Sequence, residues 1–372
     1  MKYCARCITP DSRPNILFDE LGVCSACRNF GTKRDIDWHA REQALQDVFE
    51  HAKRESHAYD CLIPVSGGKD STWQVVKCLE YGLRVLAYTW RPPGRTQIGQ
   101  RNLENLAQLG VDHIDMTISP NVEKRFTLSS FRKFGSNAIP MHLGIYNTPL
   151  RLALQMKIPL IIYGENSAFE YGNADDAKTG FAIDLNWLKK YGVTHGTTAE
   201  SWIGADGLTK KELAPYLAPD MTQLAAAGIR AIFLGYYLPW DVQLTREVAA
   251  RHGFESASAA RTGYYDYADL DDDFISIHHW MKWFKFGFTR SFDNLSLEIR
   301  NGRLSRAAAI AWLRRRGDET PNADIDKFCS WLGIARAEFD EISETFRNLE
   351  VWKNENGKWH IPGFLMEDYP WR

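Results

Sequence analysis

The chain carries Val65-Ser66-Gly67-Gly68-Lys69-Asp70-Ser71 between an apolar run and an amphipathic segment. Residues 59–65 are mostly apolar and predict a buried strand that runs into this stretch. Residues 72–81 place apolar side chains at helical spacing, and Gly82 follows as a stop signal. A glycine-rich turn between a strand and a helix is the setting in which backbone N–H groups and a helix N-terminus hold phosphate. We therefore expect a phosphate-binding loop at one edge of an α/β sheet.

The side chains of this loop suit a bound phosphate and its metal ion. The two glycines let the chain turn tightly and approach an anion closely. Lys69 adds a positive charge, and the two serines add hydroxyl donors. Asp70 stands where a Walker loop has Ser or Thr, and a carboxylate beside phosphates fits a ligand for Mg²⁺. An ordinary Gly-Gly turn is the alternative.

The PP-loop of the N-type ATP pyrophosphatases is similar to six residues of this stretch, which are Ser66, Gly67, Gly68, Lys69, Asp70 and Ser71. That superfamily includes NAD synthetase, GMP synthetase, asparagine synthetase and the tRNA thiolases. Its members cleave ATP to AMP and pyrophosphate. The resemblance implies that all six residues bind ATP, that Lys69 and Asp70 are catalytic, and that Asp70 binds Mg²⁺.

Composition limits the class of protein. The 372 residues are 44% apolar and 25% charged, which is ordinary for a globular chain of two or three domains. The formal net charge of −2 lacks the basic excess typical of nucleic-acid binding. No apolar run is long enough to span a membrane, and the first residues have no signal-peptide core. We expect a cytoplasmic protein without membrane insertion, whose seven cysteines are thiols or metal ligands.

Two Cys-x-x-Cys pairs lie near the start of the chain, Cys4 with Cys7 and Cys24 with Cys27. Their separation fits a four-cysteine zinc site. Four thiolates complete the tetrahedral shell of Zn²⁺, so the role would be structural. A segment this short cannot build its own core, so the metal would supply much of its folding energy. Two disulfides or an iron–sulfur cluster are the alternatives.

Strands and helices alternate beyond the cysteines, which predicts a doubly wound parallel sheet covered on both faces. The further expected strands are 84–90, 111–118, 159–163 and 229–234, and the expected helices are 35–56, 102–109, 121–134, 149–156 and 242–252. We divide the chain into a zinc knuckle (1–34), a PP-loop domain of the adenine nucleotide alpha hydrolase-like type (35–265) and a C-terminal helical domain (266–372). An insertion at 172–219 is expected to lie over the active site.

Ligands of open α/β sheets bind beyond the carboxyl ends of the strands. Tyr88, Thr89 and Trp90 end the second expected strand, and in PP-loop enzymes this edge holds adenine through backbone groups. We therefore expect nucleotide contacts at these three residues.

The end of the fourth expected strand is similar to a Gly-Thr-x-Asn-x-x-Glu region of NAD synthetases. Gly164 and Glu170 keep the separation, but Glu165 replaces the threonine and the asparagine is shifted. The similarity implies nucleotide contacts at Gly164 and Glu165 and an Mg²⁺ ligand at Glu170. A solvated loop carboxylate is the alternative at Glu170.

The C-terminal third begins with a helix rich in aromatic residues, and three more helices are expected at 305–316, 324–332 and 336–346. Lys282 and Lys285 project from the first helix and Arg290 follows it, so we expect these cations to meet the triphosphate from the far side. A solvated helical face is the alternative. His278 and His279 are adjacent and do not face one site on a helix, so we expect structural roles.

Four features recur together in one family: the cysteine pairs, the loop, residues 161–166 and residues 282–288. Together they resemble the N-acetyl sugar amidotransferases of bacterial surface-polysaccharide (LPS O-antigen) biosynthesis, over nearly the whole chain. The resemblance implies ATP-dependent conversion of an acetamido group on a sugar, or on a nucleotide-linked sugar, into an acetamidino group. The amide oxygen attacks the α-phosphate of ATP, and ammonia then displaces AMP. ATP, Mg²⁺ and Zn²⁺ are the implied cofactors.

Two other functions stay open. tRNA thiolases also join Cys-x-x-Cys pairs to a PP-loop, but they generally need cysteines in the catalytic domain, and here none lies between Cys78 and Cys329. A non-catalytic ATP-binding sensor is the second alternative. No cysteine lies in a glutaminase signature, so we expect a separate glutaminase partner to supply the ammonia.

Overall fold

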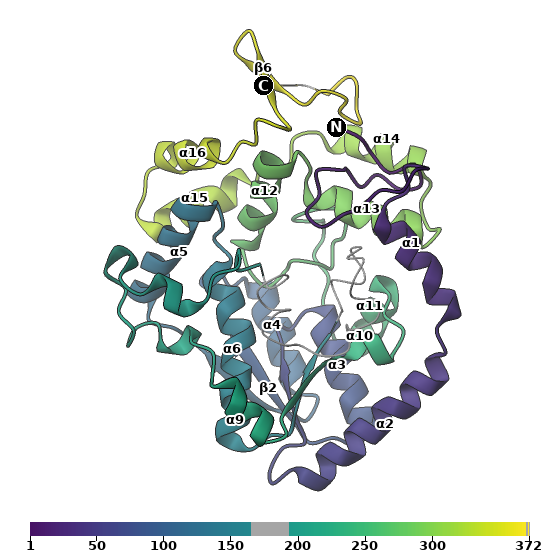
Figure 1. Cartoon of the computed structure of the whole chain (residues 1–372), viewed down its shortest axis with the longest axis vertical. Coiled ribbons are helices and arrows are strands. Elements are labelled where there is room, and N and C mark those ends of the chain that lie inside the picture. Colours follow the sequence, from purple (N-terminus) through teal and green to yellow (C-terminus); the bar gives the residue numbers. More distant parts are fainter. Residues whose placement is uncertain (165–192, 370, 372) are drawn as a thin grey trace.

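Five parallel strands form the centre of the computed structural model, which describes residues 1–164, 193–369 and 371. Their order across the sheet is β3-β2-β1-β4-β5 (Figure 1). The strands are β1 (Cys61–Pro64), β2 (Val85–Trp90), β3 (Asp112–Met116), β4 (Leu160–Tyr163) and β5 (Arg230–Phe233). The chain leaves β1 toward one edge for β2 and β3, and then returns past β1 for β4 and β5. Doubly wound folds bind ligands at such a switch point, and the expected fold class is confirmed.

The sheet is buried on both faces because successive side chains of each strand point to opposite cores. In β1, Cys61 and Ile63 belong to one core and Leu62 to the other. The first core is covered by α2 (Trp38–Glu55), α3 (Lys69–Glu80), α4 (Gln97–Ala107), α10 (Leu234–Tyr237) and α11 (Val242–Arg251). The second is covered by α5 (Pro120–Phe134), α6 (Ile139–Met156) and α9 (Met221–Ala226).

Helix α6 is longer than the sequence predicts, because Pro149 lies inside it rather than at its start. Proline is favoured in the first turn of a helix and removes one intrahelical hydrogen bond further along. Here Leu143, Leu150 and Ala153 are all buried in the second core. Packing of this apolar face therefore outweighs the missing hydrogen bond.

The described part of the expected insertion, residues 193–219, packs beside α5 and α6. The ring centroids of Trp202 and Tyr216 lie 5.2 and 5.0 Å from that of Phe126 in α5. This part forms the short helices η2 (Ala199–Trp202), η3 (Ala205–Gly207) and η4 (Ala214–Tyr216). The aromatic side chains of these residues complete the second core, and the expectation of a cover over the active site stays a prediction. Residues 172–192 lie outside the described residues.

A helical region lies beyond the sheet, at the opposite end of the molecule from the helix α9 (Figure 1). It contains α12 (Ile275–Phe286), α13 (Arg290–Arg300), α14 (Arg306–Arg316), α15 (Asn322–Leu332), α16 (Arg336–Thr345) and the hairpin of β6 (Lys353–Glu355) and β7 (Lys358–His360). Phe131 of α5 packs with Phe328 and Phe339 of this region. Among the described residues, no helix is long and apolar enough to cross a membrane.

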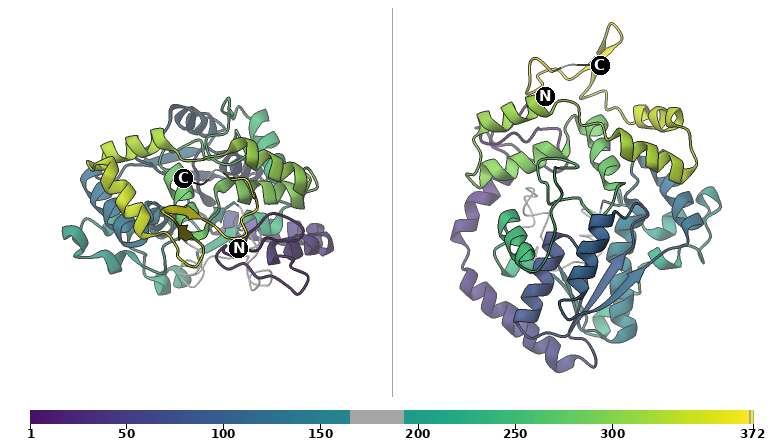
Figure 2. Two further views of the ribbon diagram at one scale, coloured as in Figure 1. Left: turned by 90° about the horizontal axis from the view of Figure 1, so that it is seen from above. Right: turned by 180° about the vertical axis from the view of Figure 1, so that it is seen from behind.

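The N-terminal segment packs against this helical region, although the two are far apart in the sequence. It includes α1 (Ser25–Thr32) and η1 (Lys33–Asp35), and α2 then runs down one side of the molecule to the sheet (Figures 1 and 2). The Met1 amino group donates a hydrogen bond to the Pro362 carbonyl at 2.6 Å. The segment before α1 therefore forms part of the C-terminal region in space.

Candidate active site

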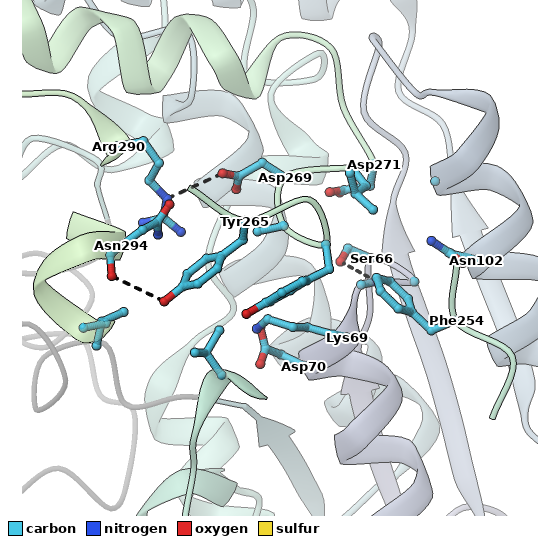
Figure 3. A pocket seen from close by; sticks show the side chains of 18 of the residues that line it. Ser66, Lys69, Asp70, Asn102, Phe254, Tyr265, Asp269, Asp271, Arg290 and Asn294 are labelled. Carbon is cyan, nitrogen blue, oxygen red and sulfur yellow. Dashed lines mark hydrogen bonds and ion pairs between the residues drawn. The ribbon is translucent and has the colours of Figure 1, made fainter. Parts of the chain in front are cut away.

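The glycine-rich loop lies at the carboxyl end of β1, directly before α3 begins at Lys69. Beside it lies a cavity of about 180 Å³ with residues 66–70 on one side (Figure 3). Residues 267–271 and the α13 side chains of Arg290 and Asn294 form the opposite side. One water needs about 10–15 Å³ on this measure, so the cavity has room for a ligand rather than for one or two waters.

The shape of the loop depends on Gly67. Its φ is +81°, and a Cβ there would lie 2.6 Å from the backbone nitrogen of Leu103 in α4. Gly68 differs, because its φ is −69° and a Cβ would approach only the Ser66 hydroxyl, at 3.1 Å. The Gly68 N–H donates to Ser66 Oγ at 3.2 Å. The loop is thus held close to α4 at Gly67 and is less crowded at Gly68.

Lys69 and Asp70 face the cavity as a pair. Lys69 Nζ lies 2.5 Å from Asp70 Oδ2, and Trp240 Nε1 donates to Asp70 Oδ1 at 3.1 Å. Each carboxylate oxygen keeps a second lone pair, so Asp70 fits an Mg²⁺ ligand while these contacts hold it. Ser71 Oγ donates to the Gly68 carbonyl at 3.0 Å and so braces the first turn of α3.

The opposite side of the cavity is organised around Asp269, whose φ is +57°. Thr262 Oγ1 donates to Asp269 Oδ2 at 2.7 Å, and His279 Nε2 and Arg290 Nε lie 3.4 and 3.5 Å from the same oxygen. Burial favours the neutral acid, but the interactions with His279, Arg290 and Thr262 outweigh it and hold the pKa of Asp269 well below its ordinary value.

Residues 263–265, which precede Asp271, pack closely against α13. Gly263 has no room for a side chain, because a Cβ would lie 2.2 Å from Asn294 Oδ1. Tyr265 OH donates to Glu298 Oε1 at 2.5 Å. Burial raises the pKa of Asp271, which lines the cavity, to about 6. This side of the cavity is therefore preorganised by contacts within the C-terminal region.

The C-terminal region is similar to a known protein family. Residues 261–365 match the model of the family described as LPS biosynthesis protein WbpG-like, C-terminal domain. This segment is similar to that domain, and residues 261–365 are called the WbpG-like domain below. The match contains Asp269, Arg290 and Asn294, so the WbpG-like domain supplies one side of the cavity.

No curated protein matches the chain significantly. One of the solved structures that match is the NMN synthetase from Francisella tularensis, at 15% sequence identity and a TM-score of 0.31. That match covers 86% of this chain and 100% of the synthetase chain. The likeness is too low to support an argument about function.

Lys282 and Lys285 do not reach the cavity, contrary to expectation. Both lie on α12 of the WbpG-like domain, but Lys282 Nζ lies 3.1 Å from Asp293 Oδ2, and Lys285 Nζ donates to the Phe134 carbonyl at 2.5 Å. Burial lowers the pKa of Lys285 to about 8. These buried contacts stabilise the packing of α12 on α13 and α5. Arg290, the third expected cation, does line the cavity.

The side chains of Tyr88, Thr89 and Trp90 also lie outside the cavity. They are at most 4% exposed, because β2 is covered on both faces. Thr89 Oγ1 donates to the Val65 carbonyl at 2.8 Å, and Trp90 fills the space where Gly144 lacks a Cβ. These three side chains are part of the protein interior.

The end of β4 is described only in part. Gly164 is packed against the Gln74 amide, which lies 2.4 Å from where a Cβ would be. Gly164 does not line the cavity. Glu165 and Glu170 lie outside the described residues. Of the expected site residues that are described, the structure brings residues 66–70 and Arg290 together.

The four cysteines of the two pairs form one buried cluster, with all ligand atoms within 4.8 Å of one another. Sγ of Cys4 lies 3.9 Å from Sγ of Cys27, and Sγ of Cys7 lies 3.7 Å from Sγ of Cys24. Tetrahedral Zn–S bonds of about 2.3 Å place sulfur atoms about 3.8 Å apart, whereas a disulfide needs about 2.05 Å. The cluster therefore fits a tetrahedral metal, and disulfides between these cysteines are excluded.

Helix α13 of the WbpG-like domain lies between this cluster and the cavity. Thr9 Oγ1 donates to Ser296 Oγ at 3.2 Å, and Arg13 Nε donates to Asp293 Oδ1 at 3.0 Å. Although burial favours a neutral Asp293, the cations of Arg13 and Lys282 lower its pKa. The residues of α13 that line the cavity are Arg290, Asn294 and Leu297. One face of α13 thus meets the cysteine segment and another meets the cavity.

Proposed function

We propose that the protein is an ATP-dependent, AMP-forming amidotransferase that converts the acetamido group of an N-acetyl sugar, carried on a nucleotide, into an acetamidino group during LPS O-antigen biosynthesis. The observation that carries the proposal is the make-up of the cavity. A glycine-rich loop at a helix N-terminus, suited to phosphate, forms one side. A domain of an LPS biosynthesis family forms the other side.

The proposed reaction has two steps. The amide oxygen of the sugar attacks the α-phosphorus of ATP, so an O-adenylyl imidate forms and pyrophosphate leaves. Ammonia then adds to the imidate carbon, loses a proton, and expels AMP to leave the amidine. The loop N–H groups and Lys69 would stabilise the charge that develops on the leaving pyrophosphate. Mg²⁺, held by Asp70, would neutralise part of the same charge.

The positions and burial of the cysteines in the described residues favour this function over that of a tRNA thiolase. Cys61 and Cys78 are fully buried in the first core, and neither lines the cavity. Cys329 lies in α15, packed with Phe131 and Phe328. A thiolase needs an accessible sulfur carrier at its nucleotide site, and these thiols do not supply one. The remaining four cysteines are gathered in the cluster, for which we propose a structural Zn²⁺.

The ammonia would come from a separate glutaminase. The cysteines just described are buried or clustered, so no described thiol is placed as a glutaminase nucleophile. We expect the single chain to use concentrated ammonium salt but not glutamine.

The test is to incubate the purified chain with ATP, Mg²⁺ and a panel of UDP-, GDP- and CMP-linked N-acetyl sugars. One sugar should support ammonium-dependent formation of AMP, pyrophosphate and a product 1 Da lighter than the substrate, since NH replaces O. Formation of ADP and phosphate instead would contradict the proposal. Turnover with glutamine alone would contradict the need for a partner. Binding of ATP without sugar-dependent pyrophosphate release would favour a sensor.

A further inference from the structure

A second, smaller cavity lies behind Asp269, inside the WbpG-like domain. Arg290 lines both cavities. Thr262 and His279 line the second cavity, and both contact Asp269, which lines the first (Figure 3 shows the Arg290–Asp269 pair). The polar side chains of Arg290, Asp269, Thr262 and His279 therefore form the partition that joins the linings of the two cavities.

The size of the second cavity limits what can enter it. Its volume is about 20 Å³, which on the same measure is enough for one or two water-sized molecules. A sugar or a nucleotide cannot enter. Ammonia is close to water in size, and the proposed reaction consumes one ammonia per turnover.

His279 gives this cavity a specific acceptor. The side chain is 8% exposed, and among the described residues neither ring nitrogen has a hydrogen-bond partner, although Nε2 lies 3.4 Å from Asp269 Oδ2. Burial lowers the pKa of His279 to about 4, so the ring is neutral near pH 7. Because Nε2 faces Asp269, we assign the ring proton to Nε2, and Nδ1 then accepts hydrogen bonds.

Most charged groups around the second cavity already have partners. Arg261, Arg290 and Arg316 line it, against one carboxylate, Glu319. Glu319 already accepts hydrogen bonds from Thr289 Oγ1 and Ser291 Oγ, at 2.5 and 2.6 Å. Arg261 is paired with Asp273 and Asp324, and Arg290 with Asp269. The one carboxylate of the lining is already hydrogen-bonded, so it does not select an ammonium ion over ammonia.

We propose that the second cavity is the entry site for ammonia, which crosses the partition of Arg290, His279 and Asp269 to reach the first cavity. This rests on the proposed function. ATP and the sugar would fill the open side of the first cavity, so the nitrogen needs another route. On arrival, the Asp269 carboxylate, which lines the first cavity, can accept a hydrogen bond from ammonia.

The test fills the second cavity without touching the first. Ser276 lines the second cavity, is 3% exposed, and donates to the Asp273 carbonyl at 2.9 Å. Ser276→Val adds a methyl group, about the size of the molecule that the cavity holds. Ser276→Ala removes the hydroxyl without filling the space. Ser343→Val is the matched control, because Ser343 is 1% exposed and donates to the Phe339 carbonyl in α16, away from both cavities.

Two readouts separate this proposal from the proposed function. Exchange of labelled pyrophosphate into ATP, dependent on the sugar that is active in the wild type, reports the first step and needs no ammonia. The KM for ammonium at fixed pH reports the second step. Ser276→Val should raise that KM at least ten-fold and leave the exchange within two-fold of wild type, while Ser276→Ala and Ser343→Val should change neither.

An unchanged ammonium KM in folded Ser276→Val would overturn the entry site and leave the proposed function standing. Absence of sugar-dependent exchange in the wild type would overturn both. If Ser276→Val does not fold, Arg316→Trp replaces it, because Arg316 is an exposed residue at the rim of the second cavity. That variant should also raise the ammonium KM alone, and a normal KM would count against the entry site.

Discussion

Replacing Gly67 by alanine should destabilise the protein far more than replacing its neighbour Gly68. Gly67 has a φ of +81°, and a left-handed conformation costs an L-residue about 1–2 kcal/mol. Its Cβ would also lie 2.6 Å from the nitrogen and 2.8 Å from the Cα of Leu103, which are backbone atoms that cannot swing aside. Overpacking of this kind costs about 1–3 kcal/mol. The sum is a loss of about 2–5 kcal/mol for Gly67→Ala.

Gly68→Ala is the matched control. Gly68 already has a negative φ of −69°, and the only near atom is the Ser66 hydroxyl, at 3.1 Å. A hydroxyl can rotate, so we expect a loss below about 1 kcal/mol. Both variants add one methyl group to the same loop, and they differ only in backbone conformation and in what the methyl group meets.

The assay is urea unfolding followed by circular dichroism, with the free energy of unfolding taken from the first cooperative transition. Gly67→Ala should move the transition to lower urea without a change in slope, because the same surface is exposed. Equal stabilities of the two variants would refute the reasoning. It would mean that the loop does not lie against α4 as the structure has it.

Three further predictions concern the site, the metal and the pH dependence. Asp70→Ala should abolish pyrophosphate release in a folded protein, whereas Lys69→Ala should lose less because backbone donors remain; near-normal turnover of Asp70→Ala would contradict its proposed role. Elemental analysis should find about one zinc per chain, which Cys24→Ser loses together with solubility, and an iron–sulfur absorption band would contradict this. Burial raises the pKa of Glu123 from 4.5 to about 7, so its contribution to stability is present below pH 4.5 and is lost toward pH 7. Between pH 4 and pH 8 the wild type should therefore lose up to about 3 kcal/mol of unfolding free energy that Glu123→Gln does not lose. A pH profile of urea unfolding that is the same in wild type and Glu123→Gln would refute this.

The parts of the fold that follow from local pattern were predictable. The apolar runs predicted all five strands of the parallel sheet, and the Cys-x-x-Cys spacing predicted the cluster of Cys4, Cys7, Cys24 and Cys27. The loop was recognised because its glycines and charges lie next to one another in the sequence. Such features can be recognised from a few consecutive residues of the sequence.

The parts that depend on contacts between distant residues were not predictable. Helix α13 was missed, although Phe292, Leu295 and Ile299 recur at helical spacing, because polar residues separate them and no strong cap precedes them. Lys282 looked like a phosphate ligand because its partner Asp293 belongs to that missed helix. The contact of His279 with Asp269 could not be predicted, because these residues come close only through the fold.

The contact of the cysteine segment with α13 bears on how the chain folds as it is synthesised. Thr9 and its partner Ser296 are 287 positions apart. At 5–20 residues per second, about 15–60 s would pass between the synthesis of the two. During that interval the cysteine segment would have no surface to dock on, so metal binding alone would have to keep it folded. Nascent chains stalled before α12 should therefore already retain zinc, and chains made under zinc depletion should misassemble at this contact rather than at the sheet.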